Sequence, residues 1–143
     1  MMIASHNLKY VLILFTMMVF TVMLRECSSQ SIHASVTNEI SKGVELHIHC
    51  KSKDTDFGDH TLINGAKFTW NFNINMFFTT LYWCNMSWTN VDGKYVHGSY
   101  NMYVARRDWK RCENDFHFYV RKDCVYGYIR KKGAFECVYS WAH

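Results

Sequence analysis

Apolar and polar side chains alternate along several short stretches of this chain, and the stretches recur roughly every ten residues. The clearest example is residues 44–50, where apolar residues and a cysteine take the even positions and Glu45, His47 and His49 take the odd ones. A period of two residues is that of a β-strand with one face buried and the other in solvent. The pattern therefore predicts a half-buried strand that ends with Cys50 on the core face.

Further stretches have the same character, and Gly-containing pairs that favour turns separate several of them. The predicted strands cover residues 35–40, 43–50, 67–74, 79–88, 95–105, 116–121, 125–130 and 135–141. In the last of them, Phe135, Cys137, Tyr139 and Trp141 share the predicted inward face. Short strands at this spacing, without a sustained helical period, are typical of all-β proteins. We expect a small antiparallel β-sandwich stapled by about two disulfides.

Residues 1–29 have the character of a secretory signal peptide. Lys9 and the amino end precede an unbroken apolar run of 15 residues from Tyr10 to Leu24, and small residues follow up to Ser29. A spanning helix needs roughly 20 such residues, so the run favours export over stable membrane insertion. Cleavage after Ser29, or alternatively after Ala34, would leave one secreted, extracellular domain; the first site gives a domain of residues 30–143.

Export determines how the cysteines are interpreted, because an oxidising compartment favours disulfides. The cysteines left after removal of the signal peptide are Cys50, Cys84, Cys112, Cys124 and Cys137. Five cysteines can form two bridges in fifteen ways, and the sequence does not choose among them. One cysteine is then left over. It could stay buried or be capped, and a disulfide-linked dimer is a further arrangement that would use it.

Five groups of residues along the mature chain share one resemblance. They are His49-Cys50-Lys51-Ser52-Lys53-Asp54 with Asp56 and Gly58, Thr80-Leu81-Tyr82-Trp83-Cys84, Tyr100 to Asp108 with Arg111-Cys112, Cys124 with Gly133, and the short stretch Val36 to Asn38. Taken in their order along the chain, they resemble the plant self-incompatibility protein family, the S-protein homologues. Cys137 is either an addition to the family pattern or a variant that some members share, which leaves the pairing of Cys112, Cys124 and Cys137 open.

The resemblance implies a small secreted β-sandwich with two disulfides, made in plants. The best-understood member of the family is a stigma-borne ligand that a pollen receptor recognises in order to reject self-pollen. Most homologues have no assigned role. The resemblance therefore favours a secreted recognition ligand more strongly than it favours a self-incompatibility determinant.

Signals for catalysis and for metal binding are weak. His47 and His49 project from one strand face, which would be half of a metal site, but no further ligand can be placed. The acidic residues between positions 54 and 59 lack the downstream glutamate of an EF-hand. The chain has no nucleophile elbow, phosphate-binding glycine loop or zinc-protease motif. We expect a non-catalytic protein that uses no cofactor or metal.

Residues 51–60 and 106–115 are predicted to be exposed loops, where recognition residues are commonly placed. The candidate partner-binding residues are Lys53, Asp54 and Asp56 in the first loop and Arg107, Trp109, Lys110 and Arg111 in the second. Trp109 lies among basic residues, and Trp and Arg often anchor protein interfaces. Further basic clusters at positions 121–122 and 130–132 would extend a positive patch if the segments meet in the fold.

We expect the partner to be a plasma-membrane receptor protein. The alternative is a secreted defence protein that binds microbial membranes or cell walls, which the positive charge and the aromatic content favour. The formal net charge of +4 is too small to indicate nucleic-acid binding.

Asn85-Met86-Ser87 is the one N-glycosylation sequon of the chain. Alternation along the predicted strand turns Asn85 away from the side on which Cys84 lies. The sequence therefore predicts an accessible glycosylation site at Asn85.

Overall fold

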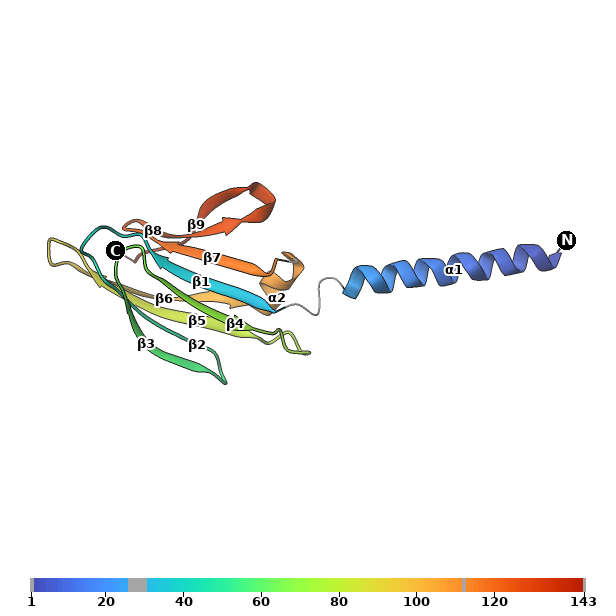
Figure 1. Ribbon diagram of the computed structural model, residues 1–143, viewed down its shortest axis with the longest axis horizontal. Helices are drawn as coiled ribbons and strands as arrows, with labels where there is room; N and C mark the ends of the chain where they lie inside the picture. The colour runs from blue at the N-terminus through green and yellow to red at the C-terminus, as the bar shows by residue number, and fades with distance from the viewer. Residues whose placement is uncertain (1, 26–30, 112, 143) are drawn as a thin grey trace. The chain divides into compact units, whose positions relative to one another are not determined.

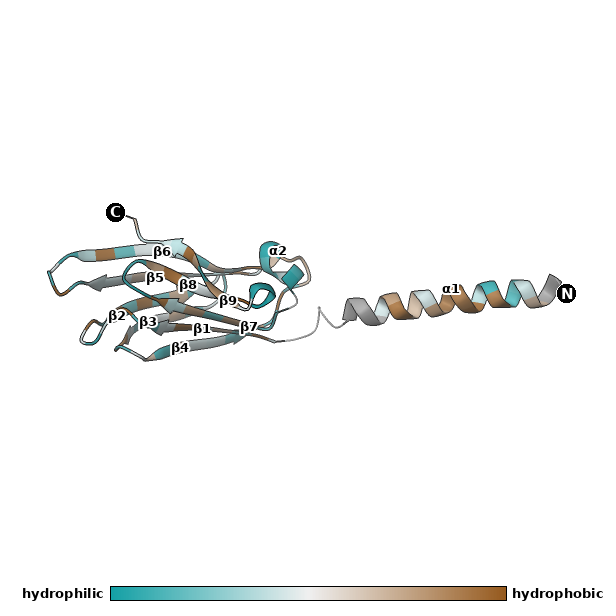
Figure 2. Ribbon diagram, turned by 90° about the horizontal axis from the view of Figure 1, so that it is seen from above, coloured by the Kyte–Doolittle hydropathy of each residue, from teal (hydrophilic) through white to brown (hydrophobic). Residues whose placement is uncertain are grey.

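The computed structural model describes residues 2–25, 31–111 and 113–142, and the chain divides into two units. The first unit contains the helix α1, Met2–Arg25. Its apolar residues gather toward its middle, whereas polar residues lie closer to its N-terminal end (Figure 2). Within the described parts of the chain, no helix has the length and apolar character needed to cross a membrane.

The second unit begins at Ser31 and is built of strands. Its elements are β1 (Ile32–Asn38), β2 (Leu46–Lys51), β3 (Asp56–Leu62), β4 (Lys67–Phe72), β5 (Leu81–Thr89), β6 (Tyr95–Val104), α2 (Ala105–Asp108), η1 (Trp109–Arg111), β7 (Asp115–Val120), β8 (Cys124–Ile129), η2 (Arg130–Lys132) and β9 (Ala134–Ser140). They form one sheet in the order β4-β1-β7-β8-β9 and a second in the order β3-β2-β5-β6 (Figure 1). The all-β fold is thus confirmed, with one departure: β1 and β7 pair in parallel.

Alternation places the core as the sequence predicts. Val44, Leu46, Ile48 and Cys50 are all buried, whereas the polar residues between them face outward. Between the two sheets the core is dominated by aromatic rings. Phe72 lies at the centre of this cluster, with its ring centroid 4.3 Å from that of Tyr82 and 4.9 Å from that of Tyr103.

The prediction of an exposed loop over residues 51–60 is wrong for most of its length. Only residues 52–55 connect two strands, because β3 begins at Asp56 and pairs with β2. The ladder contains a β-bulge, in which Phe57 and Gly58 lie opposite the single residue Cys50. Gly58 has φ +75°, a left-handed conformation that glycine adopts without steric cost. The bulge interrupts the alternation, and the acidic Gly-containing sequence therefore has the appearance of a turn.

A second bulge corrects the prediction for the last strand. The register between β8 and β9 shifts, and Val138 is the extra residue. Phe135 and Cys137 therefore lie exposed instead of sharing an inward face with Trp141, which is buried. Tyr139 is half-buried and packs against the core.

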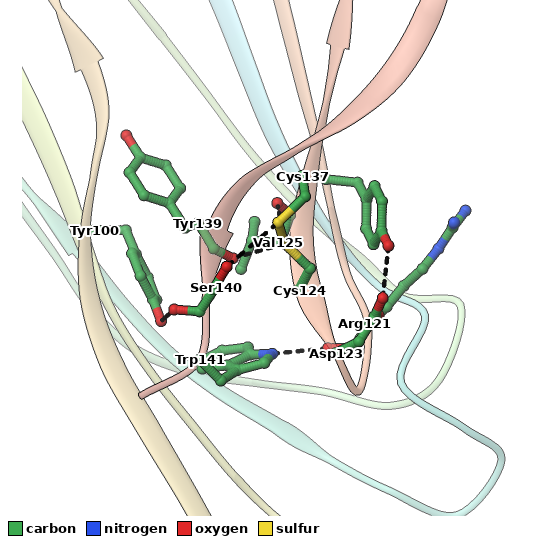
Figure 3. The surroundings of a disulfide bond; sticks show 10 residues. Tyr100, Arg121, Asp123, Cys124, Val125, Cys137, Tyr139, Ser140 and Trp141 are labelled. Carbon is green, nitrogen blue, oxygen red and sulfur yellow. Dashed lines mark hydrogen bonds between the residues drawn. A yellow bond between two sulfur atoms is a disulfide. The ribbon is translucent and has the colours of Figure 1, made fainter. Parts of the chain in front are cut away.

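Two disulfides brace the described part of the β domain. Cys50 and Cys84 are directly opposite each other on β2 and β5, and both are fully buried. Cys124 and Cys137 join β8 to β9 (Figure 3). Cys112, the fifth candidate, lies outside the described residues.

Ser140 and Trp141, near the C-terminal end of the chain, lie beside the second disulfide (Figure 3). The Nε1 atom of Trp141 donates a hydrogen bond of 2.8 Å to the carbonyl oxygen of Arg121, and the Tyr100 hydroxyl donates one of 3.2 Å to the carbonyl oxygen of Ser140. The first bond ties the residue after β9 to the turn before β8, and the second ties the last residue of β9 to β6 in the other sheet.

Candidate recognition site at the α2 end of the sandwich

Strand direction sorts the connecting segments between the two ends of the sandwich. Residues 52–55, 73–80, 105–114 and 130–133 lie at one end, which we call the α2 end, and residues 39–45, 63–66, 90–94 and 121–123 lie at the opposite end (Figure 1). Both segments predicted to carry recognition residues therefore meet at the α2 end. Of the other two basic clusters, positions 130–132 share this end, whereas positions 121–122 lie at the opposite one.

The hairpin between β2 and β3 presents Lys53 and Asp54 at its tip. The Ser52 hydroxyl oxygen accepts hydrogen bonds from the backbone N–H groups of Asp54 and Thr55, at 3.3 and 3.1 Å. The Ser52 N–H also donates to the Thr55 carbonyl oxygen at 2.7 Å. The turn is therefore ordered by its own side chain, and it leaves the ammonium group of Lys53 and the carboxylate of Asp54 in solvent.

Asp56, the third candidate of this hairpin, is engaged within the domain. Its Oδ1 atom accepts the Gly58 N–H at 2.8 Å and contacts the Nε2 atom of His49 at 2.5 Å. The hydrogen bond from Gly58, together with His49, holds the pKa of Asp56 below its usual value. The other ring nitrogen of His49 lies 3.1 Å from a carboxylate oxygen of Asp59. These contacts support the bulge of β3, and they leave 59% of the Asp56 side chain exposed.

The second predicted segment is helical, and a buried carboxylate organises it. Asp108 is 1% exposed and accepts the Val104 N–H at 2.8 Å. Arg107 donates to both Asp108 oxygens through Nε and Nη2, at 2.9 and 2.8 Å, and Nε of Arg111 lies 3.9 Å away. The hydrogen bond to Asp108 raises the pKa of Arg107 above its usual value. Both arginines therefore neutralise a buried charge.

Arg106 and Lys110 lie on the exposed side of the same segment, which is coloured as hydrophilic around α2 in Figure 2. Neither side chain has an ion-pair or hydrogen-bond partner among the described residues. Trp109 is partly exposed, and its ring centroid lies 5.2 Å from that of Phe78 in the connection between β4 and β5. The exposed cations of this segment therefore stand beside that connection.

The connection between β4 and β5 was not singled out as a site from the sequence. It presents Met76 and Phe77 almost entirely to solvent, with 90% and 80% of their surfaces exposed. The available signal was a run of three large apolar residues, positions 76–78, between two strands of a sandwich. A cavity of about 390 Å³ separates this connection from the β2–β3 hairpin, and both Lys53 and Thr79 line it.

A shallower hollow of about 490 Å³ lies on the outward face of the β3-β2-β5-β6 sheet. His47, His49 and His97 line it together with Asn85, whose side chain is exposed on β5. The strand register places Asn85 directly between His49 and Ser99. Within residues 2–25, 31–111 and 113–142, no group of three His, Cys, Asp or Glu side chains is arranged to hold a metal ion.

The family model of plant self-incompatibility protein S1 matches residues 33–141, nearly the whole β domain. The chain belongs to the plant self-incompatibility protein S1 family. It is similar to S-protein homolog 24 of Arabidopsis thaliana, with 38% identity over 96 residues that cover 67% of this chain and 61% of the relative. S-protein homolog 29 of the same plant is 35% identical over 108 residues, 75% of each chain.

The family match extends beyond Arabidopsis. Self-incompatibility protein S1 of Papaver rhoeas is 29% identical over 97 residues, 68% of each chain. A solved structure of an SPH (self-incompatibility protein homologue) protein superposes with a TM-score of 0.58 at 17% identity and covers 80% of this chain and 96% of that one. The resemblance inferred from the cysteine-containing segments is therefore confirmed at the level of family and fold.

Proposed function

We propose that this family member is a secreted, non-catalytic recognition ligand, and that a plasma-membrane receptor binds its α2 end. One observation carries the proposal: the fold gathers the two polar segments and the exposed cations Lys53, Arg106 and Lys110 at one end of a disulfide-braced scaffold. Two comparisons support it. The Papaver relative is named a self-incompatibility protein, and the solved SPH structure represents small, highly stable, secreted plant proteins.

Charge reversal at the α2 end tests this proposal. The double variant R106E/K110E should bind the surface of receptor-bearing plant cells roughly tenfold more weakly, because surface cations at an interface with an acidic partner speed association and stabilise the complex. Binding is measured by titrating labelled protein onto cells. The matched control K94E/K122E reverses two exposed lysines at the opposite end. Equal loss in both variants, or loss only in the control, would place the contact elsewhere.

The export route gives a second test. We propose that residues 1–29 are removed and that Asn85 carries an N-linked glycan, since its side chain is exposed on the open face of β5. Protein from the medium of expressing plant cells should begin at Gln30 and lose mass on treatment with a peptide N-glycosidase. The S87A variant, which keeps Asn85 but destroys the sequon, should show no such loss. An unprocessed, unshifted protein retained in the cells would contradict both parts.

A further inference from the structure

The tip of the β4–β5 connection is the most exposed apolar feature of the β domain. Met76 and Phe77 are 90% and 80% exposed, and the next most exposed large apolar residues of this domain, Val91 and Ile63, stand alone in turns at the opposite end. Isolated exposed apolar residues are normal on protein surfaces, but adjacent ones backed by further aromatic rings mark interaction sites.

The tip is held in place by a network around Asn75. Its Oδ1 atom accepts the Thr79 N–H at 2.9 Å, its Nδ2 atom donates to the Thr79 hydroxyl at 2.6 Å, and its own N–H donates to the Thr80 hydroxyl oxygen at 2.9 Å. The Phe78 N–H donates to the Asn75 carbonyl oxygen at 3.2 Å. The connection is therefore a preformed turn that projects residues 76 and 77.

Phe78 carries the strain of this turn. Its φ angle is +53°, in the left-handed region that residues other than glycine seldom occupy. Its ring packs against Trp109, so the strained residue is anchored to the η1 segment. Such strain persists where the surroundings enforce it, and it is concentrated at functional sites. The strained residue directly follows the exposed pair Met76 and Phe77.

Cations surround the apolar tip. Lys53 lines the cavity beside it, and Arg106 and Lys110 flank Trp109 on the exposed side of the α2–η1 segment. The acidic side chain of this segment, Asp108, is buried and neutralised by Arg107, so it does not oppose them. Among the described residues of the α2 end, the exposed carboxylates are Asp54 and Asp56 in the β2–β3 hairpin and Asp115 at the start of β7, and Arg130 and Lys131 add two further exposed cations. The balance around the tip is positive.

We propose that this tip, residues 75–78 with Trp109 and the three flanking cations, is a peripheral docking site for bilayers that contain anionic lipids. The tip projects outward, so it fits a penetrable surface. Apolar side chains of this length reach the boundary between headgroups and acyl chains, and lysine and arginine beside them meet anionic headgroups. This site goes beyond the proposed receptor binding because it needs no second protein.

The test is sedimentation of the purified protein with vesicles of phosphatidylcholine alone or mixed with phosphatidylserine. The wild type should sediment with the mixed vesicles and be released at high salt, because exposed electrostatic attraction is screened. The variant M76S/F77S should partition at least about tenfold more weakly, because two apolar side chains no longer leave water. The control I63S/V91S removes exposed apolar residues from the opposite end and should behave like the wild type.

Two results would overturn the proposal. The first is absence of wild-type binding to the mixed vesicles. The second is equal binding by the wild type and M76S/F77S. If M76S/F77S instead loses binding to cell-surface protein while no variant binds lipid, the tip contacts a protein and the lipid site is wrong. Because Met76 and Phe77 are exposed, the unfolding midpoint of M76S/F77S should match that of the wild type, and this check separates lost docking from lost folding.

Discussion

Replacing Asn38 with aspartate should lower the free energy of unfolding by about 3–5 kcal/mol, although the two side chains have almost the same shape. Asn38 is fully buried, and its Nδ2 atom donates to the carbonyl oxygens of Val44 and Leu62 at 2.9 and 2.8 Å. Its Oδ1 atom accepts the Ile40 N–H at 3.0 Å. A carboxylate cannot donate, so Asn38→Asp would hold a buried negative charge against two carbonyl oxygens.

Denaturant titration of the wild type and the variants measures this effect. Asn71→Asp is the matched control, because Asn71 is exposed on β4, and it should change stability by less than about 0.5 kcal/mol. The penalty for Asn38→Asp should shrink as the pH falls, because a buried carboxyl group has a raised pKa and protonation removes the charge. Equal stability of the two variants at neutral pH would show that Asn38 does not hold the two segments together.

Asn38 also shows which part of this fold can be predicted from sequence. The resemblance marks an asparagine at the end of the first strand, but the two acceptors lie 6 and 24 residues away along the chain. One of them, Leu62, belongs to β3, the strand that the sequence did not reveal. A contact of this kind depends on how strands are arranged in space, and the period of a single strand contains no such information.

Local periodicity predicted most strands and the inward face of β2, because a half-buried strand must alternate. It failed where a bulge adds a residue, as Gly58 does in β3 and Val138 in β9, since one extra residue exchanges the two faces. The sequence also did not show which side chains of the candidate site face solvent and which are engaged within the domain. Arginine is a residue type that often anchors interfaces, which is why the sequence favoured Arg107 as a binding residue. In the structure Arg107 instead donates to the buried carboxylate of Asp108, and the sequence does not show that Asp108 is buried.

The cysteine pairing illustrates the same limit and leads to the second large effect. Cys50 was correctly predicted to lie on the core face, but its partner is 34 residues away, beyond β3 and β4. Pairing follows from the adjacency of β2 and β5 in the sheet. The second bridge, between Cys124 and Cys137, closes a separation of 13 residues. The two bridges therefore constrain the unfolded chain to different extents.

Removing the bridge in C50A/C84A should cost about 4 kcal/mol of unfolding free energy, against about 3 kcal/mol for C124A/C137A, because the loss of loop-closure entropy grows with loop length. Burial increases the difference, since Cys50 and Cys84 are fully buried and their sulfur atoms also fill the core. Thermal or denaturant unfolding at one fixed protein concentration measures both values. Both variants keep Cys112, so that residue does not bias the comparison.

The two disulfides should also differ in how easily they are reduced, and the bridge between Cys124 and Cys137 should open first. Cys137 is exposed, so a mild reductant should open its bridge with Cys124 while the domain is still folded. The bridge between Cys50 and Cys84 lies inside the sandwich and should resist until the β2–β5 pair separates. Mass spectrometry after timed reduction and alkylation resolves the two steps. Faster alkylation of Cys50 and Cys84 would mean that β2 separates from β5 before β8 separates from β9. The sheet that carries the β2–β3 hairpin would then be less rigid than a preformed recognition surface at the α2 end requires.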